Sequence, residues 1–269
     1  NQLNATALGH NSLANNVNAT ALGHEATATA HNAWAIGHGA YATANHSKAL
    51  GFEATASAPN AWAQGTNASA AAENSLAWGQ GSSITANGTN AITIGTNSLA
   101  NASNAVALGS YSSATANGAL ALGANSHASG KHAIAIGFQT EASYENSFVL
   151  GTGAVANGVG AGAIGAAAQS LGSDAMAVGV NANASNTSSF ALGTNATSSG
   201  VDSSAFGVNA DASGTNAVAV GTNIERDEQD QPADVFCHVY NTAAAILQGL
   251  PVPTCTYSRG YWSGGCKCH

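Results

Sequence analysis

Residues 104–109 read Asn-Ala-Val-Ala-Leu-Gly, and residues 132–137 read His-Ala-Ile-Ala-Ile-Gly. The same phrase, with small changes, begins at Asn4 and returns through most of the chain. The sixteen copies begin at residues 4, 18, 32, 46, 60, 74, 90, 104, 118, 132, 146, 160, 174, 188, 202 and 216. The spacing is constant except after Asn74, where Gly88 and Thr89 read as a two-residue insertion. Phased repetition of this kind is the signature of a solenoid.

Each 14-residue unit contains two short segments in which side-chain character alternates. We number the positions of a unit from 1, at the residue where the phrase starts. Positions 2, 4, 9 and 11 are almost always Ala, Ser or Thr, positions 3 and 5 are mostly large and apolar, and position 6 is always Gly. Alternation with period two predicts β-strands, and an invariant Gly predicts positive φ or a close backbone approach at a turn. The unit therefore predicts one coil of an all-β parallel β-roll, with sixteen coils forming a rod roughly 75 Å long.

The first strand of the unit is apolar on both faces, so a single roll cannot bury all of it. We expect the large residues at positions 3 and 5 to point into the coil, opposite the small residues at positions 9 and 11. On that assignment Ala135, at position 4, faces a neighbouring subunit. The doubly apolar strand also predicts an obligate assembly rather than a monomer.

Composition excludes several classes of protein. Only 7% of residues are charged, and a net charge of −8 with five Lys and Arg leaves no basic patch for nucleic acid. The sequence has no apolar run long enough for a membrane-spanning helix, so we expect no membrane insertion by this segment. Catalytic and phosphate-binding motifs are missing from the sequence, which predicts a protein that is not an enzyme and takes no cofactor.

Two clusters follow from the repeat phase. His10, His24 and His38 share position 7 and would stack about 4.8 Å apart, either as a metal-binding or pH-sensitive ladder or as a turn position that tolerates His. Trp34, Lys48 and Trp62 share position 3 and would form a cation–π stack. That stack is either a surface-binding stripe or simple packing. Asn at position 1 of nine units predicts amide ladders along the solenoid.

The phrases at residues 74–79, 104–109 and 132–137, with the trailing Ser112-Ser113-Ala114, resemble the head repeat of YadA-like trimeric autotransporter adhesins. The resemblance covers residues 4–223. It implies a left-handed parallel β-roll, a homotrimer, an outer-membrane address, and binding to extracellular matrix, host cells or neighbouring cells. Heads of this family are followed by a neck and a coiled-coil stalk, which the residues after 223 do not match.

We expect three regions: a β-roll over residues 1–223, an acidic linker over 224–234, and a Cys-rich aromatic segment over 235–269 that caps the roll. The last region holds all four cysteines, which are Cys237, Cys255, Cys266 and Cys268. Cys266 and Cys268 are separated by one residue and would bond to each other only with strain, which leaves two pairings with the other two cysteines. The rival interpretation is metal binding by these cysteines with His238 and His269.

Two functions remain in view. The first is an extracellular or cell-surface adhesin, whose partners are copies of itself and a matrix protein or cell surface. The second is a structural subunit of an extracellular filament. Binding to immobilised matrix proteins would favour the first function, and long fibres of the purified chain would favour the second.

Overall fold

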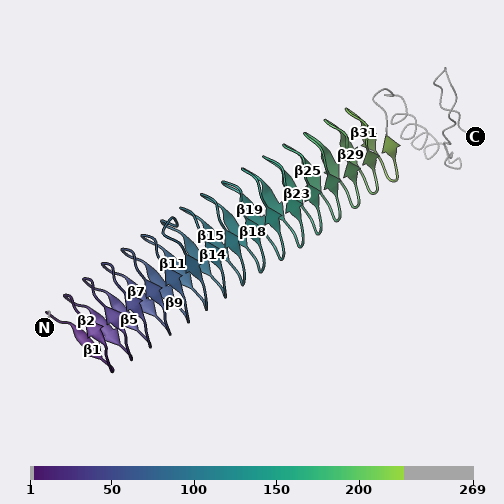
Figure 1. Cartoon of the computed structure of the whole chain (residues 1–269). Helices are drawn as coiled ribbons and strands as arrows, with labels where there is room; N and C mark the ends of the chain where they lie inside the picture. The colour runs from purple at the N-terminus through teal and green to yellow at the C-terminus, as the bar shows by residue number, and fades with distance from the viewer. Residues whose placement is uncertain (1–2, 227–269) are drawn as a thin grey trace, which may run out of the picture.

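The computed structural model describes residues 3–226, which form a straight rod of stacked coils (Figure 1). Each coil contributes one three-residue strand and one two-residue strand. The odd-numbered strands form one sixteen-stranded parallel sheet, called sheet A, and the even-numbered strands form a second, called sheet B. The described residues contain strands and turns and no helix. The predicted all-β parallel solenoid is therefore confirmed, with fifteen stacking steps between its sixteen coils.

Sheet A contains, in order along the rod, β1 (Thr6–Leu8), β3 (Thr20–Leu22), β5 (Trp34–Ile36), β7 (Lys48–Leu50), β9 (Trp62–Gln64), β11 (Leu76–Trp78), β13 (Ile92–Ile94), β15 (Val106–Leu108), β17 (Leu120–Leu122), β19 (Ile134–Ile136), β21 (Phe148–Leu150), β23 (Gly162–Ile164), β25 (Met176–Val178), β27 (Phe190–Leu192), β29 (Ser204–Phe206) and β31 (Val218–Val220).

Sheet B contains β2 (Leu13–Ala14), β4 (Thr27–Ala28), β6 (Tyr41–Ala42), β8 (Thr55–Ala56), β10 (Ser69–Ala70), β12 (Ser83–Ile84), β14 (Leu99–Ala100), β16 (Ser113–Ala114), β18 (His127–Ala128), β20 (Glu141–Ala142), β22 (Val155–Ala156), β24 (Gln169–Ser170), β26 (Asn183–Ala184), β28 (Thr197–Ser198), β30 (Asp211–Ala212) and β32 (Glu225–Arg226).

Register follows the repeat without slippage. Ala121 of β17 lies beside Ala135 of β19, and the same offset of one repeat unit holds in every pairing but those across the insertion. Across the insertion, Ala77 pairs with Thr93, so the offset grows there by the two inserted residues. Like positions therefore stack on like positions from one end of the rod to the other.

The turns depend on two kinds of backbone that favour particular residues. Positions 1 and 8 are left-handed throughout, as at Asn104 (φ 58°) and Asn125 (φ 55°), and Asn tolerates that conformation better than most residues. Position 6 has φ between 129° and 143°, a region that essentially only Gly occupies. A Cβ at Gly123 would also collide with the carbonyl oxygen of Gly137 in the next coil. Both predicted reasons for the invariant Gly are therefore present.

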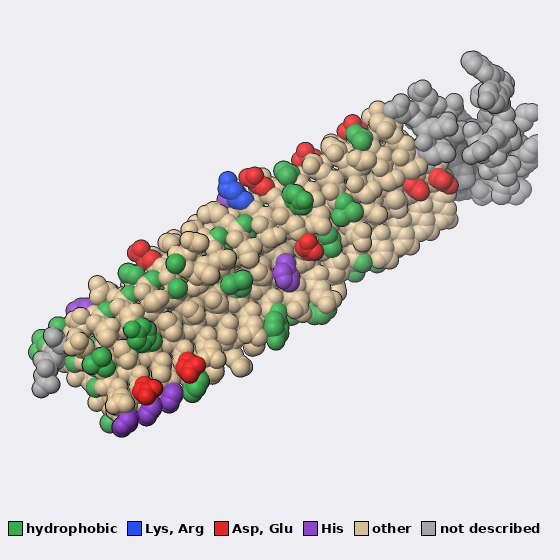
Figure 2. Space-filling view, viewed as in Figure 1, with side chains coloured by type: hydrophobic (Ala, Val, Ile, Leu, Met, Phe, Trp, Pro, Cys, Tyr) green, Lys and Arg blue, Asp and Glu red, His purple; other side chains and the backbone are tan. Residues whose placement is uncertain are grey.

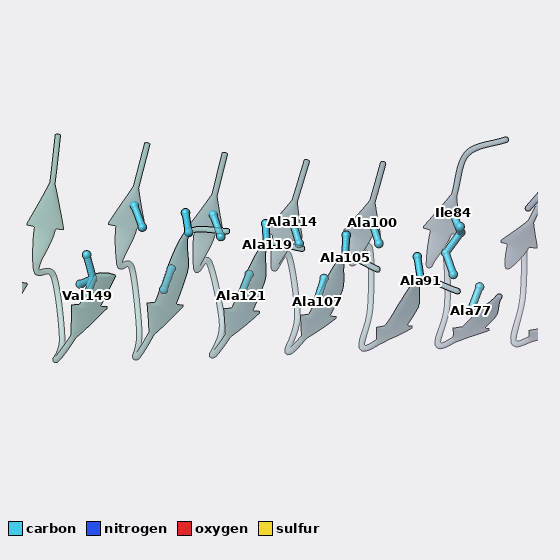
Figure 3. Packing of buried hydrophobic residues seen from close by; sticks show 14 of the residues in the cluster. Ala77, Ile84, Ala91, Ala100, Ala105, Ala107, Ala114, Ala119, Ala121 and Val149 are labelled. Carbon is cyan, nitrogen blue, oxygen red and sulfur yellow. The ribbon is translucent and has the colours of Figure 1, made fainter. Parts of the chain in front are cut away.

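The interior of the roll is filled mainly by Ala side chains, with some Ser and Thr. From the second coil onward, the small residues at positions 2, 4, 9 and 11 are buried, and most are fully inaccessible to solvent (Figure 3). Apart from Ser and Thr, the only side chains larger than Ala among the most deeply buried described residues are Ile84 and Val149. The large residues at positions 3 and 5 lie on the outer face of sheet A, as Leu122 and Ile134 illustrate.

The prediction that positions 3 and 5 point inward is therefore wrong. Two strands of three and two residues, joined by tight turns, leave room between the sheets only for small side chains facing small side chains. Ala135 is inside the coil and fully buried, so it does not face a neighbouring subunit. The large face, and not the small one, is the part of sheet A that a single roll leaves uncovered.

The buried Ser hydroxyl groups in this interior form hydrogen bonds with groups nearby in the chain, whereas the buried Thr93 Oγ1 has no partner. Ser112 at position 9 donates to the carbonyl oxygen of Gly109 at 2.8 Å, and Ser147 at position 2 donates to that of Tyr144 at 2.7 Å. Both bonds reach back three residues, to the turn that starts the strand. Ser can thus replace Ala inside the coil without leaving an unsatisfied polar group.

The two extra residues enlarge the loop between β12 and β13. Gly88 donates its N–H to the carbonyl of Thr85 at 2.9 Å, and Ala91 donates to the carbonyl of Gly88 at 2.9 Å. A Cβ on Gly88 would meet Cγ2 of Ile84 at 2.5 Å, so the glycine gives space to the large interior side chain. The insertion therefore bulges outward while the strands on either side keep their pairing (Figure 1).

The acidic linker beyond Arg226 and the Cys-rich cap lie outside the described residues, together with Cys237, Cys255, Cys266 and Cys268. Their disulfide and metal interpretations remain predictions.

Candidate functional site

The outer face of sheet A carries two columns of apolar side chains, at positions 3 and 5. Position 5 is apolar in every unit except at Gln64, and this column of side chains follows the rod along its whole length. Position 3 is apolar in the central units but reads Thr, Thr, Trp, Lys and Trp in the first five. Many of these side chains are exposed, including Leu122 at 40% and Ile134 at 39%. Soluble monomers rarely expose so continuous an apolar surface, which is typical of an interaction face.

The second feature is the stack of Trp34, Lys48 and Trp62 in the position 3 column. Lys48 Nζ lies 5.4 Å from the centroid of the Trp34 ring and 4.7 Å from that of Trp62. The three residues belong to β5, β7 and β9, whose parallel pairing places them side by side. A cation between two indole rings lies within the distance at which cation–π attraction operates.

An open groove of about 420 Å³ runs along this stack. Its lining combines position 3 with the neighbouring position 1 and consists of Asn32, Trp34, His46, Lys48, Asn60 and Trp62. Asn32 Nδ2 lies 2.8 Å from Nδ1 of His31 and 3.4 Å from Nδ1 of His46. The groove therefore faces the polar side of the column, away from position 5, and offers aromatic rings, amides, imidazole and one ammonium group.

The third feature is a stack of imidazole rings at position 7. The ring centroids of His10 and His24 lie 5.1 Å apart, and those of His24 and His38 lie 4.8 Å apart, with interplanar angles of 13° and 11°. Phe52 continues the stack at 5.1 Å from His38. Figure 2 shows a row of His side chains along one edge of the rod near its N-terminal end, with acidic side chains beside it.

A carboxylate completes this cluster. Glu25 Oε2 lies 3.9 Å from Nδ1 of His24, and one ligand atom from each of His24, Glu25 and His38 lies within 4.8 Å of the others. All three residues are exposed. The sequence interpretation grouped only residues that share position 7, so it did not include Glu25 in the cluster. The position of Glu25 directly after His24 in the sequence was the signal that could have identified it.

Comparison with known families agrees with this geometry. The family model described as YadA head domain repeat matches residues 2–26, 14–40, 28–54, 56–82, 86–112, 114–140, 170–196 and 198–223, which together cover more than half of the chain. The chain belongs to the YadA head family. It is an adhesin family, generally non-enzymatic, and its repeats imply a surface-exposed, adhesin-type repetitive head. No curated protein matches the chain.

Within this YadA head, amide ladders occur at both left-handed turn positions. At position 1, Asn60 Nδ2 donates to Asn74 Oδ1 at 3.0 Å, as predicted. At position 8, which the sequence interpretation did not single out, Asn195 donates to Asn209 at 3.1 Å and Asn209 donates to Asn223 at 2.8 Å. The same residue thus serves the turn backbone and the contact between coils.

The YadA head offers no further site of obvious chemistry in residues 3–226. This part of the chain holds no helix with the length and apolar character needed to cross a membrane. Over the same residues, the only cluster of three metal-ligating side chains is the one formed by His24, Glu25 and His38.

Proposed function

We propose that this chain is the head of a homotrimeric cell-surface adhesin, with a left-handed roll in each subunit. The observation that carries the proposal is the apolar outer face of sheet A, which runs the length of the rod in a chain of the YadA head family. Three rods packed by this face would bury the position 5 column at their centre. The central units would add position 3 to the contact, because there it is apolar as well.

Adhesion then falls to the surfaces that such packing leaves open. The groove along Trp34, Lys48 and Trp62 lies on the polar side of the position 3 column, next to position 1, and its residues suit contact with a polar macromolecule. Aromatic residues are enriched at the centres of protein interfaces because they bury large areas at low entropic cost. We propose extracellular matrix protein or the surface of a host or neighbouring cell as the partner.

Assembly is tested by placing one charge on two similarly exposed apolar sites. Leu122→Glu changes position 5 of the sheet A face, which is 40% exposed, and Val180→Glu changes a turn residue that is 46% exposed. Sedimentation at low micromolar concentration should give a trimer for the parent chain and for Val180→Glu, and a smaller species for Leu122→Glu. A stable monomeric parent, or equal behaviour of the two variants, would contradict the proposed interface.

Adhesion is tested separately, on the assembled protein. Binding to immobilised matrix proteins and clumping of cells that display the chain should both fall when Trp62 is replaced by Ala. The oligomeric state of this variant should stay that of the parent. Long fibres of the purified chain, with no binding to matrix or cells, would favour a filament subunit instead.

A further inference from the structure

We propose that His24, Glu25 and His38 form a binding site for one divalent transition-metal ion of the zinc, nickel or copper type. The two imidazoles come from adjacent coils, and the carboxylate comes from the turn between β3 and β4. Their ligand atoms already lie within 4.8 Å of one another.

The geometry needs only small side-chain movements to hold an ion. Two ligands bound to one Zn²⁺ at about 2.0–2.2 Å lie roughly 3.0–3.5 Å apart in tetrahedral geometry. The three side chains are exposed on two neighbouring turns, so rotation about their χ angles can close the remaining distance without moving the backbone. The backbone is fixed by bonds between coils, including Glu25 N–H to the carbonyl of His10 at 2.9 Å. Water would fill the remaining coordination positions.

The kind of ion follows from the ligands. Imidazole nitrogen suits zinc, copper and nickel, whereas calcium and magnesium take oxygen ligands almost exclusively. Two imidazoles and one carboxylate therefore favour the first group. The charge of the region agrees, because Lys48 is the only Lys or Arg among residues 3–130.

A second acidic residue, Glu53, occupies the same repeat position as Glu25, two coils further along. Position 8 carries Glu25, Gly39 and Glu53 in three successive coils. A Cβ added to Gly39 would lie 3.4 Å from Cγ of Glu53, which is ordinary contact, and the Glu53 N–H donates to the carbonyl of His38 at 2.9 Å. The imidazole stack therefore has Glu25 on the turn of His24 and Glu53 on the turn of Phe52, which are two acidic residues in a part of the chain that has few charges.

Binding would join two coils across one stacking step. His24 is shared by both neighbouring pairs of the stack, since its ring lies 5.1 Å from His10 and 4.8 Å from His38. One ion per chain is therefore expected, and His24 is the residue that no arrangement can do without. The site lies on the turns and not on the apolar face of sheet A, so it does not rest on the proposed trimer.

The test is calorimetric titration of the full chain with Zn²⁺ and, separately, Ni²⁺. The four cysteines are alkylated first, because thiolates bind the same ions. Saturable binding of one ion per chain is expected. His24→Gln should abolish it, and this change is compatible with the fold because Gln80 occupies the same position in another unit. His38→Gln and Glu25→Gln should each weaken binding at least about 10-fold, and His10→Gln should change it least.

The matched control is His132→Asn, which removes an imidazole from position 1, where nine other units carry Asn. It should bind like the parent. Broadening of His ring proton signals by substoichiometric Cu²⁺ should begin with His24 and His38. The proposal is overturned if no saturable binding occurs, if His24→Gln binds like the parent while remaining folded by circular dichroism, or if His132→Asn loses binding equally.

Discussion

The first five units, residues 4–73, and the units from Asn90 onward share one interior but differ in their outer surface. Ala35 and Ala135 occupy the same position and are equally inaccessible to solvent. On the outside, position 3 carries polar and aromatic residues in the first group and Ile, Val, Leu, Ile and Phe in the five units that start the second. The imidazole stack and the groove both belong to the first group. Spacing between the sheets constrains the inside of every coil, whereas the outside is free to differ, so function has to be sought on the surface.

The largest loss in the free energy of unfolding should come from a charge placed inside the coil. This loss should be the same in both regions. Ala35→Arg and Ala135→Arg each place an unpaired charge where no solvent reaches, at a cost of about 3–5 kcal/mol or more. Both variants should lose most of the cooperative transition seen by urea denaturation with circular dichroism. A folded Ala135→Arg variant would show that position 4 does not lie inside the coil. It would contradict the conclusion that the two regions share one interior.

A smaller loss is expected from a methyl group at the Gly column. Gly123→Ala meets both an unfavourable φ of 135° and the next coil's carbonyl, so we expect a loss of about 3 kcal/mol in the free energy of unfolding. Gly153→Ala, at φ 64° and with no atom nearby, should cost only about 1 kcal/mol. Chemical denaturation measures both, and equal losses would mean that contact between coils does not explain the invariant Gly.

The outer surfaces should respond differently in the two regions. Ile134→Lys changes an apolar residue of the central units, whereas Thr20→Lys changes the same position among the polar units. Only the first should weaken self-association, by about 1–2 kcal/mol per subunit, because it removes buried apolar area and leaves a charge in its place. Sedimentation over a range of concentrations gives both association constants. Similar association constants for the two variants would show that position 3 of the central units is not part of the contact between subunits.

The smallest effect concerns the coil that follows the insertion. Thr93 Oγ1 is buried with no hydrogen-bond partner in the structure, whereas Val149 occupies the same position of another unit. Thr93→Val should therefore stabilise the roll by about 1 kcal/mol. Thr20→Val, at a position on the outer face, is the control and should change stability by less than about 0.5 kcal/mol. A destabilised Thr93→Val would imply that the hydroxyl is paired in solution.

Much of this architecture could be predicted from the sequence, because an interpretation of one repeat unit applies to all sixteen units. The strands, their register and the neighbours within each column all follow from the constant repeat length, including the contacts of Lys48 with Trp34 and Trp62. The direction of the side chains did not follow. Alternation identifies the two faces of a strand but does not say which face points into the coil. When both faces are apolar, the distance between the two sheets decides which side chains fit inside.

The candidate sites were predicted in part for a related reason. Columns of one position are visible in the sequence, so the imidazole stack was found. Contacts between different positions depend on the shape of the turn, and Glu25 and the pairing of position 1 with position 3 in the groove were therefore missed.

The hydrogen bonds between coils run along the rod, and this direction governs how the molecule behaves under tension. A chain that enters at one end of the stack and leaves at the other loads its coils in series. Each coil that peels away releases one repeat unit, about 46–50 Å of extended chain, in place of a single step of about 4.8 Å. A rod held at both ends would lengthen by discrete increments under load, and each coil that unfolds would dissipate work and limit the rise in tension at the attachment.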